Sequence, residues 1–247
     1  MNCKNCENPV SDNFCSHCGQ RSDVSQITIS KLLNDLTESI FQFNSSLLFT
    51  IKELSTRPGY SIQDFLNGKR KSHFKPIAYL LLFSTIYFLI AKLTNQATWM
   101  NDIITGFSNG AYNGGKEFKL PKLISIVVNN FAYTTLLLIP LFSLASYVCF
   151  PKKVNYLEHI VLNSYITGHQ ALLYTGFIIL KSIIDIKVLE LVPVLVTTAY
   201  TFWVFAQFFN TRSRLSNFFR SLLTYLLYWV FCSLAFLMLM AIQDFLI

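Results

Sequence analysis

The chain has 247 residues, of which 53% are hydrophobic and only 13% charged, and its formal net charge is +7 at pH 7. Soluble domains carry roughly 25% charged residues, so this composition argues against an ordinary soluble protein. It predicts instead an all-α polytopic membrane protein, with the positive charge beside the membrane spans rather than on a nucleic-acid surface.

The N-terminal tail, residues 1–23, carries two Cys-x2-Cys pairs separated by eight residues: Cys3, Cys6, Cys15 and Cys18. This spacing fits a tetrahedral Zn²⁺ site, because each pair forms a knuckle whose sulfurs reach one ion at about 2.3 Å. The alternative is two disulfides, which require an oxidising compartment. Since the charge pattern described below puts the tail in the cytoplasm, we expect reduced thiols and a small zinc ribbon with structural Zn²⁺.

The tail is not expected to bind nucleic acid. It has two basic side chains against three acidic ones, a net charge of −1, and four thiolates on a divalent ion would add −2. Such a tail offers phosphates little electrostatic attraction. We expect a folding module or a docking surface for a protein partner.

Residues 24–75 form the predicted amphipathic, juxtamembrane helical segment. Apolar residues recur at steps of three and four between residues 29 and 54, with a break predicted at residues 44–46. A turn at residues 57–59 ends this helix. A second short helix is predicted to begin at Ser61, with Asp64 completing a capping box.

Residues 76–247 form the predicted transmembrane domain. Five stretches are apolar and long enough to cross a hydrocarbon core of about 30 Å. The predicted spans are 76–93, 123–150, 156–180, 188–209 and 218–242. An alternative makes the third and fourth a re-entrant pair and leaves three spans.

Basic residues predict the orientation. One set of flanks holds nine of them: Lys69, Arg70, Lys71, Lys75, Lys152, Lys153, Arg212, Arg214 and Arg220. The opposite flanks hold six: Lys92, Lys116, Lys119, Lys122, Lys181 and Lys187. The positive-inside rule therefore places the N-terminus in the cytoplasm.

The basic residues just before the first span are Lys69, Arg70, Lys71 and Lys75. Each such charge is worth about 1 kcal/mol against an anionic leaflet. The simpler interpretation is anchoring and topology. The more specific one is a contact with a lipid head group or phosphate, to which Arg70 would offer two parallel donors.

The third span carries a predicted intramembrane polar site: Glu158, His159, Asn163, His169 and Gln170. Polar groups at membrane depth are costly and face the bundle interior or water. One interpretation is hydrogen bonding between helices. The other is a pathway or pocket with Glu158 and His159 as a gate.

The order of these features resembles an uncharacterised bacterial family of membrane proteins with an N-terminal zinc ribbon, known only as a domain of unknown function. The residues that carry the resemblance are Arg57-Pro58-Gly59, Gly68-Lys69-Arg70, Pro76 and Glu158-His159. In that family further histidines tend to follow the Glu-His pair, whereas here Tyr165 and Thr167 occupy much of the stretch, which weakens a metal site there. The resemblance implies a multi-pass protein of the bacterial inner membrane and supplies no activity.

No His-Glu-x-x-His, acidic dyad or Gly-x-Ser-x-Gly motif occurs in the sequence, so no catalytic residue is predicted. The leading hypothesis is a non-enzymatic adaptor or regulatory membrane protein that contacts membrane lipids and, through the ribbon, a protein partner. The alternative is a small transporter, channel or lipid-handling protein that uses the polar residues of the third span. A homo-oligomer, the ligand and the physiological process stay open.

Overall fold

The computed structural model describes residues 1–24, 27–29, 45–96, 131–151, 154–184, 191–210 and 213–246. The regular elements in these ranges are α-helices: α2 (Ser45–Thr56), α3 (Pro58–Leu66), α4 (Pro76–Leu93), α7 (Phe131–Cys149), α8 (Tyr156–Ile183), α9 (Val192–Phe208) and α10 (Arg214–Leu246). The predicted all-helical fold is therefore confirmed. Each predicted span corresponds to one helix, and α4 has the predicted bounds. Residues 123–130 and 188–190 of the second and fourth predicted spans lie outside the described ranges.

Helices α2 and α3 lie in the predicted amphipathic segment, residues 24–75, of which residues 25–26 and 30–44 are not described. Helix α2 is described from Ser45 onward, so the predicted break at residues 44–46 falls at the edge of a described range. Helix α3 begins at Pro58, three residues before the predicted start at Ser61, because proline is pre-organised for the first helical position. The Ser61 hydroxyl contacts the His73 ring instead of a helix N–H. The capping-box prediction at Ser61 is therefore wrong.

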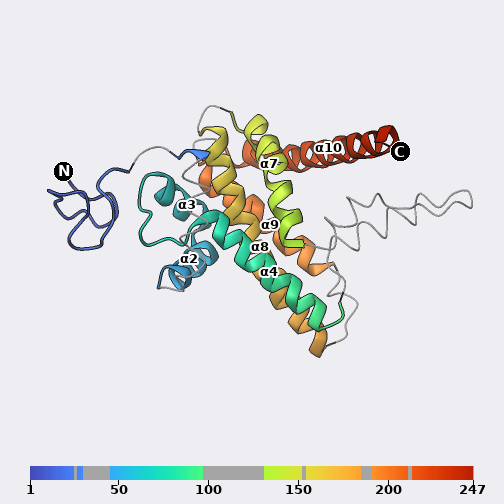
Figure 1. Ribbon diagram of the computed structural model, residues 1–247, viewed down its shortest axis with the longest axis horizontal. Helices are drawn as coiled ribbons and strands as arrows, with labels where there is room; N and C mark the ends of the chain where they lie inside the picture. Colours follow the sequence, from blue (N-terminus) through green and yellow to red (C-terminus); the bar gives the residue numbers. More distant parts are fainter. Residues whose placement is uncertain are drawn as a thin grey trace, which may run out of the picture.

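Helix α8 is the centre of the bundle. It packs against α4, α7 and α9 and also touches α2 and α3, and Figure 1 shows α4 and α8 running side by side. Helix α10 packs on α7 and α9, and its C-terminal end extends away from the other helices (Figure 1). Three buried polar residues of α10, Asn217, Ser221 and Thr224, all lie near its N-terminal end.

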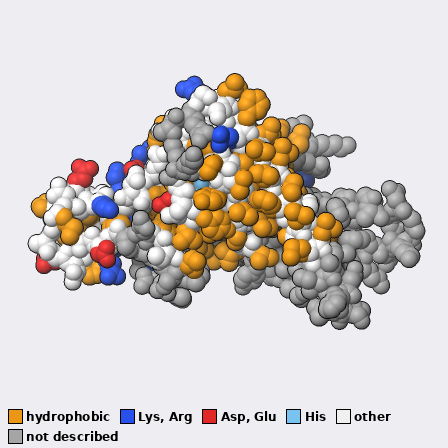
Figure 2. Space-filling model, turned by 90° about the horizontal axis from the view of Figure 1, so that it is seen from above, with side chains coloured by type: hydrophobic (Ala, Val, Ile, Leu, Met, Phe, Trp, Pro, Cys, Tyr) orange, Lys and Arg blue, Asp and Glu red, His pale blue; other side chains and the backbone are white. Residues whose placement is uncertain are grey.

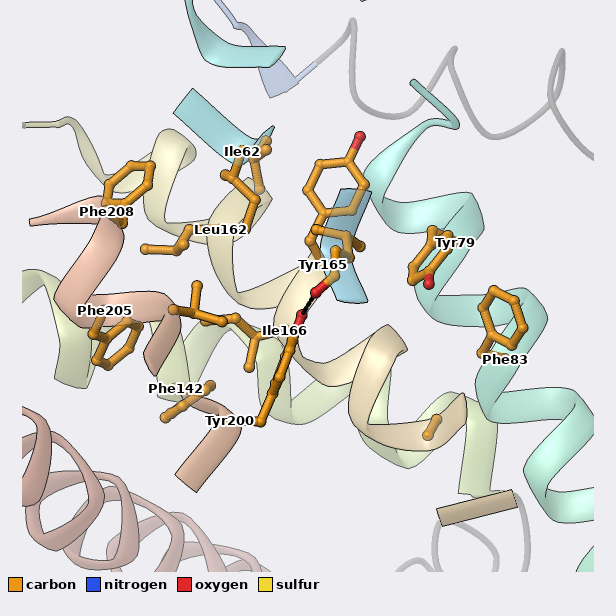
Figure 3. Close-up of a cluster of buried hydrophobic side chains, with 14 of the residues drawn as sticks. Ile62, Tyr79, Phe83, Phe142, Leu162, Tyr165, Ile166, Tyr200, Phe205 and Phe208 are labelled. Atoms are coloured by element: carbon orange, nitrogen blue, oxygen red, sulfur yellow. Dashed lines mark hydrogen bonds between the residues drawn. The ribbon is translucent and has the colours of Figure 1, made fainter. Parts of the chain in front are cut away.

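The core consists largely of aromatic and branched side chains on facing helices. Tyr165 and Ile166 of α8 lie between Tyr79 of α4 and Phe205 of α9 (Figure 3). The Tyr165 hydroxyl donates to the Phe74 carbonyl oxygen at 2.6 Å, so this buried polar atom is satisfied. The contact ties α8 to the residues that immediately precede α4.

Many large hydrophobic side chains of the helical body are exposed. Hydrophobic side chains cover the helices in Figure 2, whereas charged side chains gather around the N-terminal tail and near one edge of the bundle. Two segments within the described ranges are long and apolar enough to cross a membrane, Pro76–Leu93 and Arg214–Met238. The apolar helices Thr134–Cys149 and Val192–Phe208 are shorter.

Candidate metal centre, basic loop and pocket

The four cysteines of the tail meet at one point. The Sγ atoms of Cys3 and Cys18 are 3.6 Å apart, as are those of Cys6 and Cys15, and all four sulfurs lie within 4.8 Å of one another. All four are free thiols rather than disulfides. These four residues could bind a metal ion.

The two halves of the tail have the same backbone structure, twelve residues apart. Matching pairs of main-chain hydrogen bonds run from Cys3 N to Asn8 O and Cys15 N to Gln20 O, and from Glu7 N to Cys3 O and Gly19 N to Cys15 O. Isolated bridges pair Asn2 with Pro9 and Phe14 with Arg21, again twelve residues apart. Each Cys-x2-Cys pair therefore sits on its own tight knuckle, and the two knuckles face each other.

Backbone amides also point at the sulfurs. The N–H groups of Asn5 and Cys6 lower the pKa of the Cys3 thiol, and the Asn8 amide lowers that of Cys6. In a tetrahedral site with sulfurs about 2.3 Å from the ion, neighbouring sulfurs are about 3.8 Å apart. The observed 3.6 Å separations match that value closely. The donor set and its spacing thus fit Zn²⁺.

The tail docks on the basic loop, which we define as residues 67–75 between α3 and α4. Gln20 is buried, and its side-chain Nε2 donates to the Gly68 carbonyl oxygen at 2.9 Å. Its Oε1 accepts from the backbone N–H groups of Arg70 and Lys71, both at 3.1 Å. One side chain of the tail therefore bonds to three backbone groups of the loop, at residues 68, 70 and 71.

Gly68 allows this close approach. Its φ of +115° is unfavourable for other residues, and a Cβ there would lie 2.7 Å from Lys4 Cδ and 3.2 Å from Val24 Cγ1. The Ser72 hydroxyl adds a contact by donating to Asn5 Oδ1 at 3.1 Å. The tail and the loop are thus complementary along several residues.

The basic loop holds the four residues predicted to contact head groups: Lys69, Arg70, Lys71 and Lys75. Lys69 Nζ lies 3.1 Å from Asp64 Oδ1, and the Arg70 guanidinium stacks over the Phe65 ring at 5.7 Å. Lys71 is exposed, and Lys75 is the N-cap residue of α4. The four residues are close neighbours along the loop, but their side chains have different surroundings.

His73 supports the loop from inside. Its Nδ1 donates to the Lys69 carbonyl oxygen at 2.7 Å, and its Nε2 accepts from the Ser61 hydroxyl at 3.0 Å. Burial lowers the pKa of His73, so the ring is neutral at pH 7. The positive charge of the loop therefore comes from lysine and arginine alone.

The turn between α2 and α3 is fixed by a shared arginine. Arg57 Nη2 lies 2.6 Å from Glu53 Oε2 and 3.3 Å from Asp64 Oδ2. The Gly59 N–H donates to Gln207 Oε1 of α9 at 3.0 Å, which satisfies a free donor at the start of α3. The Arg-Pro-Gly stretch therefore links α2, α3 and α9.

Two adjacent residues of the third predicted span, Glu158 and His159, are not brought together. Glu158 forms a capping box with Asn155 at the exposed start of α8. His159 is fully buried, and its Nδ1 lies 2.9 Å from Ser146 Oγ of α7. The Asn-x-x-Glu pattern at residues 155–158 was a sequence signal for this cap.

Asn163 and Gln170 bond to neighbouring helices. Asn163 Nδ2 donates to Ser146 Oγ of α7 at 2.8 Å. Gln170 Nε2 donates to the Thr197 carbonyl oxygen at 3.0 Å and to Thr201 Oγ1 at 2.9 Å, both on α9. This geometry favours the interpretation of these residues as hydrogen-bonding links between helices.

His169 has a different setting, at the edge of a pocket of about 410 Å³. Its Nε2 lies 3.3 Å from Ser55 Oγ of α2, and its Nδ1 lies 3.0 Å from the Tyr79 hydroxyl of α4. The remaining lining is apolar or aromatic: Leu173, Val196, Ala199, Tyr200 and Trp203. Among the predicted polar residues, His169 is the one that lines this pocket.

The fold and the cysteine cluster together define a class: an all-helical chain with a four-cysteine cluster before helices apolar enough to cross a membrane. Residues 44–88 match the model of a family described as a protein of unknown function (DUF3667). The matched part runs from α2 through the Arg-Pro-Gly turn and the basic loop into α4 and is similar to that uncharacterised family. A comparison with curated proteins and one with solved structures each find no match.

Proposed function

We propose that this chain is a multi-pass protein of the bacterial inner membrane whose zinc ribbon works as a non-enzymatic adaptor or regulatory module. The observation that carries the proposal is the Gln20 contact, which joins the metal centre to the loop directly before the first span. A metal-dependent fold at residues 3–18 thereby sets the shape of a basic surface beside the lipid. Membrane lipids and a protein partner are the proposed ligands of that surface.

Zn²⁺ is the proposed metal, held by Cys3, Cys6, Cys15 and Cys18. A small tail needs such a cross-link, because chains below about 40 residues seldom bury enough apolar surface to fold alone. The buried apolar cluster of the tail consists of Val10 with the cysteines. When bound, the ion would supply the covalent-like connection between the two knuckles.

We propose that α4, α7, α8, α9 and α10 each cross the membrane, with the tail on the cytoplasmic side. What supports this is the position of the helix ends. The end of α9 packs on α3, and the Arg220 guanidinium near the start of α10 donates to the Cys149 carbonyl at the end of α7. These ends therefore lie on the side of the basic loop, where the positive-inside rule favours arginine and lysine.

Two cysteine substitutions test this sidedness in intact cells with a membrane-impermeant maleimide. Lys52→Cys, on the exposed face of α2, is expected to stay unlabelled until the cells are broken. Ser182→Cys, exposed at the far end of α8, is expected to be labelled in intact cells. Labelling of Lys52→Cys before lysis would reject the cytoplasmic tail, and protection of Ser182→Cys would reject α8 as a spanning helix.

The coupling between ribbon and loop is tested with Gln20→Ala. Loss of the side chain removes the acceptor of the partly buried Lys71 N–H, whereas the Arg70 N–H keeps the Gly68 carbonyl oxygen as a second acceptor. An unpaired donor costs about 1–3 kcal/mol. We expect the Lys71 amide hydrogen to exchange roughly tenfold faster or more, with the metal content per chain unchanged. Asn13→Ala, an exposed position of the same tail, serves as the control. Equal exchange in Gln20→Ala and the parent protein would remove the basis of the adaptor proposal.

A further inference from the structure

The pocket beside His169 lies at the junction of three helices. Ser55 comes from the end of α2, His169 from α8, and Trp203 from α9. Its volume of about 410 Å³ is within the range of small-molecule sites. Val196 and Trp203 are each 38% exposed, so the pocket opens onto the apolar outer surface of the bundle. An occupant would enter from the lipid side.

The depth of the pocket follows from Tyr79. This residue lies in the first turn of α4, and its hydroxyl contacts His169 at 3.0 Å. In the membrane placement proposed above, on which this inference rests, the start of α4 is the cytoplasmic boundary of the hydrocarbon core. A partly exposed tryptophan is typical of that boundary. The pocket therefore faces the junction between head groups and acyl chains.

The hydrogen bonds of Ser55 and His169 determine which polar atom of the pocket is available to an occupant. Ser55 Oγ donates to the Ile51 carbonyl oxygen at 2.7 Å, so its proton is already used. His169 Nε2 then donates to Ser55 Oγ at 3.3 Å, and the Tyr79 hydroxyl donates to His169 Nδ1 at 3.0 Å. Every proton has an acceptor in this arrangement, and the Ser55 oxygen keeps one lone pair.

This assignment has two chemical consequences. Because His169 Nε2 carries a proton, it is not a base for Ser55, and the pair lacks the arrangement of an activated nucleophile. The exposed Ser55 oxygen is instead an acceptor and selects an occupant with an O–H or N–H donor. Lys52, one turn earlier on α2 and also exposed, lies on the same helix face and offers a positive charge to a phosphate.

We propose that this pocket binds a phospholipid whose head group carries a hydrogen-bond donor beside its phosphate, such as ethanolamine or glycerol. The head group donates to Ser55 while its phosphate lies toward Lys52. An acyl chain fills the apolar part between Leu173 and Ala199. Phosphatidylcholine has the same phosphate and chains but no donor, so the site discriminates against it.

The test measures lipid binding to the full chain in detergent by native mass spectrometry, with phosphatidylethanolamine, phosphatidylglycerol and phosphatidylcholine of identical acyl chains. We expect either donor lipid to bind about tenfold tighter than phosphatidylcholine, the effect of one unpaired polar group. The difference in affinity between the two donor lipids shows whether the site prefers the ethanolamine or the glycerol head group. Equal binding of all three lipids by the parent protein overturns the proposal.

Variants locate the effect. Ser55→Ala is expected to abolish the discrimination, and Ala199→Phe, which fills the pocket, to abolish binding of all three lipids at this site. Ser233→Ala is the matched control, because Ser233 is also exposed on an apolar helix and donates to the carbonyl four residues earlier. Discrimination that survives Ser55→Ala overturns the proposal. Labelling of Ser182→Cys in intact cells reports on the membrane placement separately, since Ser182 does not line the pocket.

Discussion

Replacing Cys15 with serine is expected to abolish metal binding and unfold the N-terminal tail, while the helical body stays folded. Structural Zn²⁺ contributes roughly 10–16 kcal/mol to small zinc modules, more than any other single contact in the tail. The effect stays local because the tail has its own buried cluster, separate from the core of the helices. Elemental analysis should find one zinc per chain in the parent protein and none in Cys15→Ser, whose tail should also become sensitive to proteases.

The control for Cys15→Ser is Cys232→Ser. Cys232 is a half-buried thiol on α10, outside the cysteine cluster, so its removal changes the number of thiols without touching the four ligands. The Cys232→Ser protein should retain one zinc per chain. Metal-free parent protein, or Cys15→Ser with a full complement of metal, would contradict the zinc assignment.

Gly59→Ala is expected to separate α3 from α9. A Cβ at this position would lie 2.4 Å from Gln207 Cβ, 2.6 Å from the Phe208 backbone nitrogen and 2.7 Å from the Val204 carbonyl oxygen. Two of these atoms are helix backbone and cannot rotate away, so relief requires a shift of a whole helix. We expect a loss of about 3 kcal/mol, at the upper end for overpacking. Thermal unfolding in detergent should show a clearly lowered midpoint.

Gly176→Ala is the matched control for Gly59→Ala. Gly176 also lies within a helix, α8, but a Cβ there meets nothing within 4 Å. Alanine should therefore stabilise this helix by about 0.5–1 kcal/mol. A Gly59→Ala protein whose unfolding midpoint equals or exceeds that of the parent would show that α3 and α9 do not pack as described.

Features set by neighbouring residues were predictable from the sequence. Pro76 starts a long and mostly apolar run, and α4 has the predicted bounds. The cysteine spacing predicted the cluster for the same reason, because each knuckle closes within a few residues. The error in the predicted start of α3 also has a local cause, because Pro58 takes the first helical position. The Ser61 hydroxyl contacts His73 instead of capping the helix.

Features that join distant parts of the chain left no such pattern. Gln20 is an ordinary polar residue until residues 68–71, on the far side of two helices, come to meet it. The pocket likewise combines Ser55, His169 and Trp203 from three helices, and the sequence distinguished only His169 by its polarity. Tertiary packing decides such sites, whereas spacing along one helix does not.

The sequence separations in the tail also suggest an order of assembly during synthesis. The sulfur contacts close over at most 15 residues, whereas the bonds from Gln20 to the loop close over 48 to 51. Contacts between nearby residues form faster, and domains fold from the N-terminus as the chain emerges. The knuckles can thus capture their ion while the first span is still inside the ribosome, and docking then becomes a late step that accompanies insertion into the bilayer.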